Sequence, residues 1–185
     1  MLKRWKQLSS RTVLKNPWWT YMLDEFRIPG GTSGEYNYVH TNGSSMVVPV
    51  LPDGRIILVN QYRYLCDRES IELPCGGVKE GKSREEMAQI ELTEETGYRA
   101  AVLTPAGSFN PFNGVTDEMC SVFIATGLES APAVPDATEE FEVLLRTPAE
   151  VDELISTNVI WDGMTIAAWT LVRHTLLQQP APSSI

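Results

Sequence analysis

The sequence predicts an α/β (α+β) fold, in which a mixed β-sheet is sandwiched between helices and preceded by an N-terminal β-strand arm. Three observations lead to this class. Apolar runs typical of strands recur along the chain, other segments carry helical periodicity or helix caps, and the two kinds do not alternate strictly. The chain has 185 residues, 43% of them hydrophobic. We therefore expect an arm at residues 1–42, one main domain at 43–178 and a flexible tail at 179–185.

The arm is expected to contain two strands. Residues 18–26 and 35–41 are rich in aromatic and β-branched side chains. The glycine-rich stretch 29–34 between them is typical of a turn. The arm is therefore interpreted as strand, turn and strand.

A β-hairpin is predicted at the start of the main domain. Two apolar runs, residues 46–51 and 55–63, flank the turn sequence Pro-Asp-Gly. Residues 66–83 are rich in turn-forming residues and are expected to lead from this hairpin into a helix.

The second half of the chain is predicted to hold further strands and then two helices. The strands are expected at residues 100–109, 119–128 and 141–146, with a loop at 131–140 before the last of them. The helices are expected near residues 148–155 and 164–178, the second being amphipathic through Ile166, Trp169, Leu171 and Val172.

The charge of the chain excludes some classes of binding partner. The net charge is −9 and the pI is about 4.7, which argues against binding nucleic acid or an anionic membrane surface. No stretch approaches the roughly 20 apolar residues of a membrane span, and the N-terminus lacks a signal-peptide core.

The three cysteines have no CxxC spacing, so we expect a cytoplasmic protein with reduced thiols. An acidic protein that handles phosphate would need a metal ion to offset its own charge.

The predicted helix after the turn-rich segment is strongly acidic. Ser83 is a suitable N-cap with a glutamate three residues later, and Gly97 is placed to end the helix. Glu91, Glu94 and Glu95 fall within about 100° of one helix face. One interpretation is a solvated acidic face. The other is a hard cation, Mg²⁺ or Mn²⁺, held by carboxylates, because the flanking residues are apolar and a glycine-rich loop precedes the helix.

Residues 76–98, GGVKEGKSREEMAQIELTEETGY, resemble the Nudix box. In this register Gly76 is the first glycine, and Glu91, Leu92, Glu94, Glu95 and Gly97 match the second half of the pattern. Further segments of the chain, VNQYRY, IELPCGG, GSFNPFNGVTDE and ATEEFEV, look like parts of ADP-ribose and nucleoside diphosphate sugar pyrophosphatases. The resemblance implies a Nudix fold and the hydrolysis of a diphosphate attached to another group.

The resemblance also implies a metal site. Glu91 and Glu95 are the first-choice ligands, with Glu94 next, and the main-chain carbonyl of Cys75 is a further oxygen ligand. The loop glycines that follow, Gly76 and Gly77, are expected beside the substrate.

Two positions depart from the pattern. Lys82 stands where the box has glutamate, and Ile90 stands where it has arginine. Because both members of the charge pair are replaced, no charge is left without a partner. We therefore expect apolar packing of Ile90 to hold the helix in place of that pair. The competing interpretation is a degraded, non-catalytic box.

The general base is expected on the loop before the last strand, where the resemblance places a glutamate. Glu139 and Glu140 both occupy that place, and the sequence does not choose between them. A solvated loop glutamate is the alternative for each. Glu94 on the helix is the remaining candidate for the base.

Other residues are candidates for substrate contacts. Arg63 follows an apolar strand and suits a phosphate, or else forms a structural ion pair with Glu72. Glu118 matches an acidic position near the substrate in the related enzymes, or is a surface acid. The aromatic residues of the arm, Trp18, Trp19 and Tyr21, can supply a face for a base or belong to a core or an interface.

The resemblance implies that the arm is exchanged between the subunits of a homodimer. The expected reaction is Mg²⁺-dependent hydrolysis of a nucleoside diphosphate sugar, ADP-ribose or similar, to a nucleoside monophosphate and a sugar phosphate. ADP-ribose enzymes commonly carry a proline at the position that Asn113 occupies in this register, whereas this chain has its proline at Pro111. The shift keeps the nucleoside diphosphate sugar class but argues against strict ADP-ribose specificity. The alternatives are a non-catalytic nucleotide sensor and a hydrolase of nucleoside triphosphates or dinucleoside polyphosphates.

Overall fold

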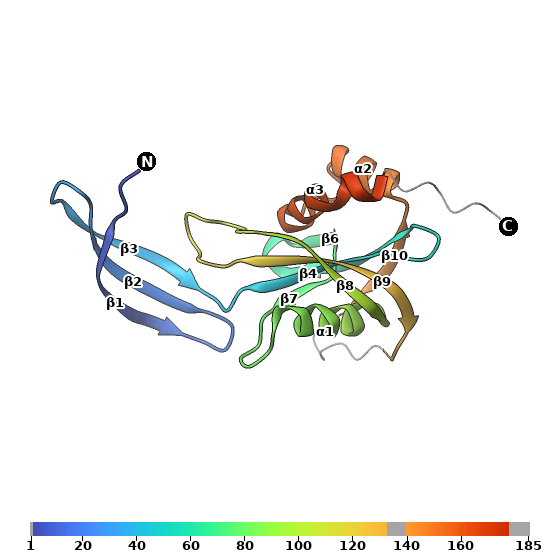
Figure 1. The fold of residues 1–185 in the computed structure, drawn as a ribbon, viewed down its shortest axis with the longest axis horizontal. Helices are drawn as coiled ribbons and strands as arrows, with labels where there is room; N and C mark the ends of the chain where they lie inside the picture. The colour runs from blue at the N-terminus through green and yellow to red at the C-terminus, as the bar shows by residue number, and fades with distance from the viewer. Residues whose placement is uncertain (1, 133–139, 178–185) are drawn as a thin grey trace.

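The computed structural model describes residues 2–132 and 140–177, which form three β-sheets and three α-helices among the described residues (Figure 1). The first sheet is the arm, and Figure 1 shows it projecting away from the rest of the molecule. Its strands, in the order β1-β2-β3, are β1 (Lys6–Lys15), β2 (Thr20–Arg27) and β3 (Ser33–His40). The predicted strand–turn–strand is confirmed as β2 and β3. The sequence pattern missed β1, because every residue of this strand is exposed and its apolar residues, Leu8, Val13 and Leu14, do not alternate regularly with polar ones.

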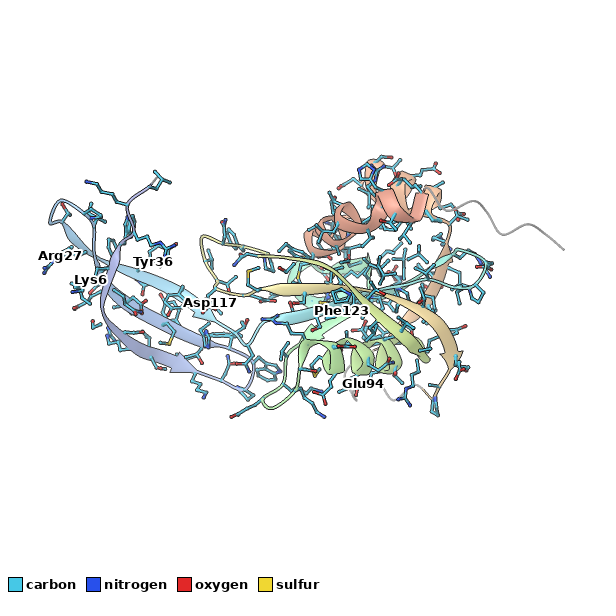
Figure 2. All side chains as sticks on the ribbon, in the orientation of Figure 1. Lys6, Arg27, Tyr36, Glu94, Asp117 and Phe123 are labelled. Carbon is cyan, nitrogen blue, oxygen red and sulfur yellow. The ribbon has the colours of Figure 1, made fainter. Side chains whose placement is uncertain are left out.

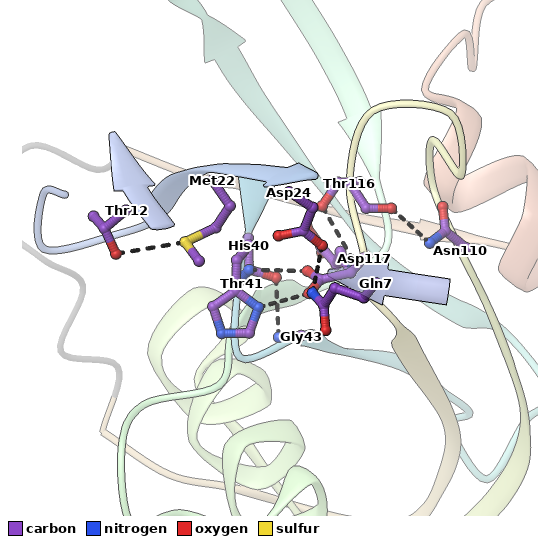
Figure 3. A network of polar contacts seen from close by, with 11 residues as sticks. Gln7, Thr12, Met22, Asp24, His40, Thr41, Gly43, Asn110, Thr116 and Asp117 are labelled. Atoms are coloured by element: carbon purple, nitrogen blue, oxygen red, sulfur yellow. Dashed lines mark hydrogen bonds and ion pairs between the residues drawn. The ribbon is translucent and has the colours of Figure 1, made fainter. Parts of the chain in front are cut away.

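Backbone and polar side-chain contacts join the arm to the body. The amide of Val39 on β3 donates to the carbonyl of Val115 at 2.8 Å. The imidazole of His40 lies 2.6 Å from the carboxylate of Asp117, which also accepts from the amide of Thr41 (Figure 3). The arm is therefore held at its β3 end by the loop between β8 and β9.

The body contains a mixed four-stranded sheet and an antiparallel three-stranded sheet. In the first, ordered β7-β4-β9-β8, β4 and β9 are parallel and the other pairs are antiparallel. Its strands are β4 (Ser44–Pro49), β7 (Cys75–Gly77), β8 (Tyr98–Phe109) and β9 (Cys120–Ser130). The second is ordered β10-β5-β6, with β5 (Ile56–Arg63), β6 (Arg68–Glu72) and β10 (Glu142–Arg146).

The predicted hairpin at residues 46–63 is only partly formed. The turn is present, since the amide of Leu51 donates to Arg55 and the amide of Gly54 donates to Leu51. The strands share a single bridge, Val50 with Ile56, and then enter different sheets. Each is a central strand with neighbours on both edges, so pairing with those neighbours replaces the ladder of a simple hairpin.

The turn-rich segment before the helix holds two strands that the sequence did not predict, β6 and the short β7, which pairs with β4. β6 covers Arg68–Glu72 and pairs antiparallel with β5. Its sequence is mostly polar, so its extended form depends on the backbone ladder with β5 rather than on an apolar face of its own.

Helices cover both faces of the body, as predicted. Figure 1 shows α1 (Arg84–Thr96) on one side of the sheets and α2 (Pro148–Ser156) with α3 (Gly163–Leu177) on the other. Alternate residues of β4 divide between the two layers. Val47 packs with Leu92 of α1 and with Phe123, which Figure 2 labels, whereas Val48 packs with Trp169 of α3. A fully buried side chain such as Leu92 contributes about 2 kcal/mol by leaving water.

The apolar face of α3 differs from the prediction at one position. Trp169 and Val172 are buried and Ile166 packs against the core, but Leu171 is 43% exposed. Leu171 lies at the edge of the helix face, beside Gly107 of β8. The strands predicted at 100–109, 119–128 and 141–146 and both C-terminal helices are confirmed to within about two residues. None of the helices within the described residues is long and apolar enough to cross a membrane.

Candidate active site

The start of α1 is set by a complete capping box. The Ser83 hydroxyl accepts from the amide of Glu86 at 3.1 Å, and the Glu86 carboxylate accepts from the amide of Ser83 at 2.7 Å. The helix ends at Gly97, whose φ of 71° is left-handed. These two caps set where α1 begins and ends. The face that meets the sheet is set by the buried Ala88 and Leu92, which pack with Val47 of β4.

Glu91 lies directly against Gly76 of β7, a short strand where the sequence predicted a glycine-rich loop. A Cβ atom on Gly76 would be 2.2 Å from Oε1 and 2.5 Å from Oε2 of Glu91. Real side chains do not tolerate such distances, so only glycine allows the backbone to approach this carboxylate so closely. Gly77, in contrast, has open space where its Cβ would be.

Glu95 lies one helical turn further and is 7% exposed. The carboxylates of Glu91 and Glu95 both influence the pKa of Cys75, the residue before Gly76. A hydrogen bond with Cys120, burial, and the negative charges of Glu95 and Glu91 together raise the pKa of the Cys75 thiol. This thiol is therefore protonated at neutral pH, and the chemistry available at Cys75 is that of its main-chain oxygen.

The residues at this junction fit a hard divalent cation. The candidate donors are the carboxylates of Glu91 and Glu95, the half-buried Glu94 on the same helix, and the main-chain carbonyl of Cys75 on β7, next to the Gly76 that Glu91 contacts. Mg²⁺ and Mn²⁺ prefer such oxygen ligands. Within residues 2–132 and 140–177, no three histidine, cysteine, aspartate or glutamate side chains are already placed to hold an ion. Cation binding would therefore require small side-chain movements or main-chain ligands.

Lys82 and Ile90, the two departures from the box, have different surroundings in the structure. The Lys82 ammonium lies 3.9 Å from Glu86, four residues on, and both side chains are about half exposed. Such surface pairs contribute little. Ile90 is half-buried on α1.

Arg63 and Glu72 form an ion pair beside the acidic helix. The guanidinium donates from Nε to Glu72 Oε1 at 2.7 Å and from Nη2 to the other oxygen. The Glu72 side chain is only 4% exposed, whereas that of Arg63 is 47% exposed. This hydrogen bonding raises the pKa of Arg63. The ion pair expected as one interpretation is confirmed, and it leaves the rest of the guanidinium open to solvent.

Two adjoining cavities meet at this ion pair. The smaller measures about 310 Å³ and the larger about 810 Å³. Arg63, Glu72, Asp162 and Met164 line both. The smaller cavity also includes Trp18, Ser44, Cys75, Gly76, Gly77 and Glu118. The larger also includes Tyr62, Tyr64, Leu65, Glu140 and Trp161.

The structure brings together most, but not all, of the predicted substrate contacts. Trp18 reaches the smaller cavity from the β1–β2 turn, and Glu118 accepts a hydrogen bond there from the Ser44 hydroxyl at 2.6 Å. Trp19 and Tyr21 line neither cavity. Both belong to the arm, where the Tyr21 hydroxyl donates to Asn37.

Of the two glutamates predicted as candidates for the base, Glu140 is among the described residues and Glu139 is not. Glu140 is exposed and lines the larger cavity beside Arg63. Glu139 lies outside the described residues.

Sequence reasoning missed Trp161 and Asp162, which precede α3. The Asp162 carboxylate accepts from the amide of Thr165 at 2.7 Å, as an N-cap does. An aspartate before a helix is a visible capping signal, and Trp161 next to it is a large aromatic residue outside any predicted element. The sequence pattern did not reveal that both residues lie across from Arg63, because that proximity depends on tertiary packing.

The chain is similar in sequence and in fold to known proteins. Residues 41–167 match the NUDIX domain. The ADP-ribose pyrophosphatase of Bacillus subtilis is 29% identical over 170 residues, covering 88% of this chain and 92% of that protein. The methanol dehydrogenase activator of Bacillus methanolicus is 28% identical, covering 94% and 91%. The crystal structure of an ADP compounds hydrolase superposes with a TM-score of 0.85 at 22% identity, covering 98% of both chains, and so shares the fold.

Proposed function

The chain belongs to the NUDIX family of hydrolases, and on that premise we propose that it cleaves the diphosphate linkage of a nucleoside diphosphate sugar. ADP-ribose or a similar compound would yield a nucleoside monophosphate and a sugar phosphate. The resemblance noted at residues 76–98 is thereby confirmed at the level of the family. The relative from Bacillus subtilis, named for ADP-ribose, supports this substrate class.

One observation carries the proposal. The solvent-exposed side of Arg63 lies where the two cavities meet, and the same smaller cavity is bordered by Gly76, which Glu91 contacts. A diphosphate at this junction would place one substituent in each cavity. Its charge would be opposed by Arg63 on one side and by a cation at the carboxylates on the other.

The chain's own residues have distinct roles in this proposal. Glu91 and Glu95, with Glu94 and the Cys75 carbonyl, would hold Mg²⁺ or Mn²⁺, which would supply positive charge to offset that of the diphosphate. Arg63 donates to those oxygens while the buried Glu72 carboxylate fixes the orientation of the guanidinium.

A base is needed to take a proton from the attacking water, whose oxygen joins one phosphorus as the bridging oxygen leaves with the other. Glu140 is our candidate, since it lines the larger cavity beside Arg63. Glu139 and Glu94 are the other carboxylates that the sequence offers for this role.

The arm is proposed to join two copies of the chain into a homodimer, with residues 1–42 as the dimerisation segment. Exposed apolar side chains on or beside its strands support this, among them Trp5, Leu8, Val13, Leu14 and Trp19. Monomeric proteins rarely leave so many large apolar groups together on one small sheet. The net charge of −9 and the three free thiols support a cytoplasmic location without nucleic-acid or membrane partners.

The proposed function is tested by turnover of a substrate panel with and without Mg²⁺. The panel contains ADP-ribose, other nucleoside diphosphate sugars, a nucleoside triphosphate and a dinucleoside polyphosphate, with products separated by chromatography. We expect Mg²⁺-dependent release of a nucleoside monophosphate from the nucleoside diphosphate sugars. Binding of these compounds without any turnover would favour the non-catalytic sensor instead, and preferred cleavage of the triphosphate would move the chain to another class of hydrolase.

A further inference from the structure

Arg84, the first residue of α1, is bonded through its side chain to the main chain at two strand starts. Its guanidinium donates from Nη1 to the carbonyl of Met119 at 2.5 Å and to the carbonyl of Ser44 at 3.3 Å. Ser44 begins β4, and Met119 directly precedes β9. The two strands already meet here, since the amide of Ser44 donates to the same Met119 carbonyl at 3.2 Å. The arginine therefore ties α1 to the junction of β4 and β9.

The backbone around this guanidinium leaves room for it. A Cβ atom on Gly43 would lie 2.5 Å from Nη1 and 2.7 Å from Nη2 of Arg84, so only glycine at position 43 allows this close approach. The main chain of Arg84 is held as well, because the buried hydroxyl of Ser45 donates to its carbonyl at 2.8 Å. Both the side chain and the backbone of residue 84 are therefore fixed on the sheet.

Arg84 lies on the same face of α1 as two of the candidate cation ligands. At about 100° per residue, Glu91 is about 20° from Arg84 around the helix axis, and Glu95 is about 20° away in the other direction. Glu94, in contrast, is about 80° away. A rise of about 1.5 Å per residue places Glu91 about 10 Å and Glu95 about 16 Å further along the axis. Where the first turn sits on the sheet therefore influences where these two carboxylates lie relative to Cys75 on β7.

Apolar packing and the bonds of Arg84 constrain the helix in different ways. Ala88 and Leu92 pack with Val47 and set which face of α1 meets the sheet. Apolar packing is non-directional, whereas hydrogen bonds require a defined donor–acceptor geometry. The bonds of Arg84 therefore fix the first turn more narrowly than packing alone. A site for Mg²⁺ needs such precision, because this cation demands near-ideal octahedral geometry.

We propose that Arg84 is a positioning residue, which holds the first turn of α1 on the sheet so that the Glu91 and Glu95 carboxylates keep the spacing that a divalent cation requires. The inference rests on the proposed function, because the cation belongs to it. Arg84 is not among the described residues that line either cavity, so it acts through the helix and not on the substrate. Residues that orient metal ligands typically influence metal affinity about 10- to 100-fold.

The test measures cation binding directly, without turnover. Electron paramagnetic resonance of free Mn²⁺ gives the affinity of the wild type, and the binding that Glu95→Gln removes is counted as the site. We expect Arg84→Met to weaken this binding about tenfold or more. Arg84→Lys should weaken it less, since an ammonium keeps donors near the carbonyls but lacks the planar guanidinium. Arg99→Met is the matched control, because Arg99 is exposed on β8 just beyond α1, and this variant should keep the wild-type affinity.

Turnover of ADP-ribose separates positioning from a general loss of structure. In Arg84→Met the Mg²⁺ concentration for half-maximal activity should rise about tenfold or more. KM for ADP-ribose at saturating Mg²⁺ should stay near the wild-type value, because Arg84 does not contact the substrate.

Three results would overturn the inference. They are a wild type without Mn²⁺ binding at this site, an unchanged affinity in folded Arg84→Met, and an equal loss in Arg99→Met. If Arg84→Met does not fold, a wild-type affinity in Arg84→Lys overturns the inference instead. If no nucleoside diphosphate sugar is hydrolysed while the Mn²⁺ affinities change as expected, the proposed function fails and the inference is supported.

Discussion

Gly76 shows how a single missing side chain can shape a site. The Glu91 carboxylate occupies the position that a Cβ on this residue would need. The glycine therefore matters for the approach of β7 to α1, and not for an unusual backbone angle.

Substituting this glycine gives a matched pair of variants. Gly76→Ala should displace the Glu91 carboxylate and weaken activation by Mg²⁺ about tenfold or more, the range seen when groups around a metal site are disturbed. Gly77→Ala, with open space at its Cβ, should have a much smaller effect. Titrating activity with Mg²⁺ measures both. Equal responses of the two variants would show that the Gly76–Glu91 contact has no part in metal binding.

Glu140 allows a test of the base. Glu140→Gln should lower kcat by a factor of about 10² or more, because the amide cannot take the proton from water. The Mg²⁺ dependence and KM should change little, unlike the effect of losing a metal ligand. Steady-state kinetics at saturating Mg²⁺ gives the result. A variant with near-normal kcat would move the role to Glu139 or Glu94.

At the scale of elements, the segments with a periodic or capping signal were predicted well. The Ser83 box and Gly97 placed α1 correctly because capping depends on neighbours in sequence. The β1, β6 and β7 strands were missed, since their form depends on backbone pairing with β2, β5 and β4 respectively. The same limit applies to the site: Arg63 and Glu72 could be suggested as a pair, whereas the proximity of Trp161 and Asp162 to them arises only from tertiary packing.

One carboxylate of α2 bonds two side chains of α3, beside the apolar packing of the two helices. Asp152 accepts from Arg173 Nε at 3.1 Å and from Trp169 Nε1 at 2.7 Å. The hydrogen bonding to Arg173 is the main cause that lowers the pKa of Asp152. A carboxyl whose pKa is lowered on folding stabilises the protein above its unfolded pKa and loses that contribution as the pH falls.

Asp152→Asn should therefore lower the free energy of unfolding by about 1 kcal/mol at pH 7. The difference from wild type should begin to shrink as the pH falls below about 4, the ordinary pKa of an aspartate, and should be lost as the pH falls through the lowered pKa of the folded carboxyl. Thermal melts across pH 3–7 provide the measurement. The control is Asp53→Asn, because the Asp53–Arg55 pair lies exposed within one turn and joins no two elements. A pH-independent difference for Asp152→Asn would exclude the charge as the cause.

At the scale of the whole molecule, the arm projects from the body (Figure 1). It exposes apolar side chains. If it joins two copies, analytical ultracentrifugation should give twice the 20.6 kDa mass of the chain. Leu14→Asp, at a position 51% exposed on β1, should shift the equilibrium toward the monomer, because it places a charge in the interface. Leu177→Asp, 42% exposed on α3, is the control and should remain dimeric. A monomeric wild type would leave the arm without this role.

The central claim is that the glutamates of α1 hold the cation on which hydrolysis depends. The most direct test is turnover of ADP-ribose against Mg²⁺ concentration, for the wild type and for Glu95→Gln, with melting temperatures measured on both without metal. The account predicts that wild-type turnover saturates with Mg²⁺ and ceases in excess chelator. Glu95→Gln should be inactive at all Mg²⁺ concentrations and still fold. Full wild-type activity in chelator, or normal kinetics in Glu95→Gln, would contradict it.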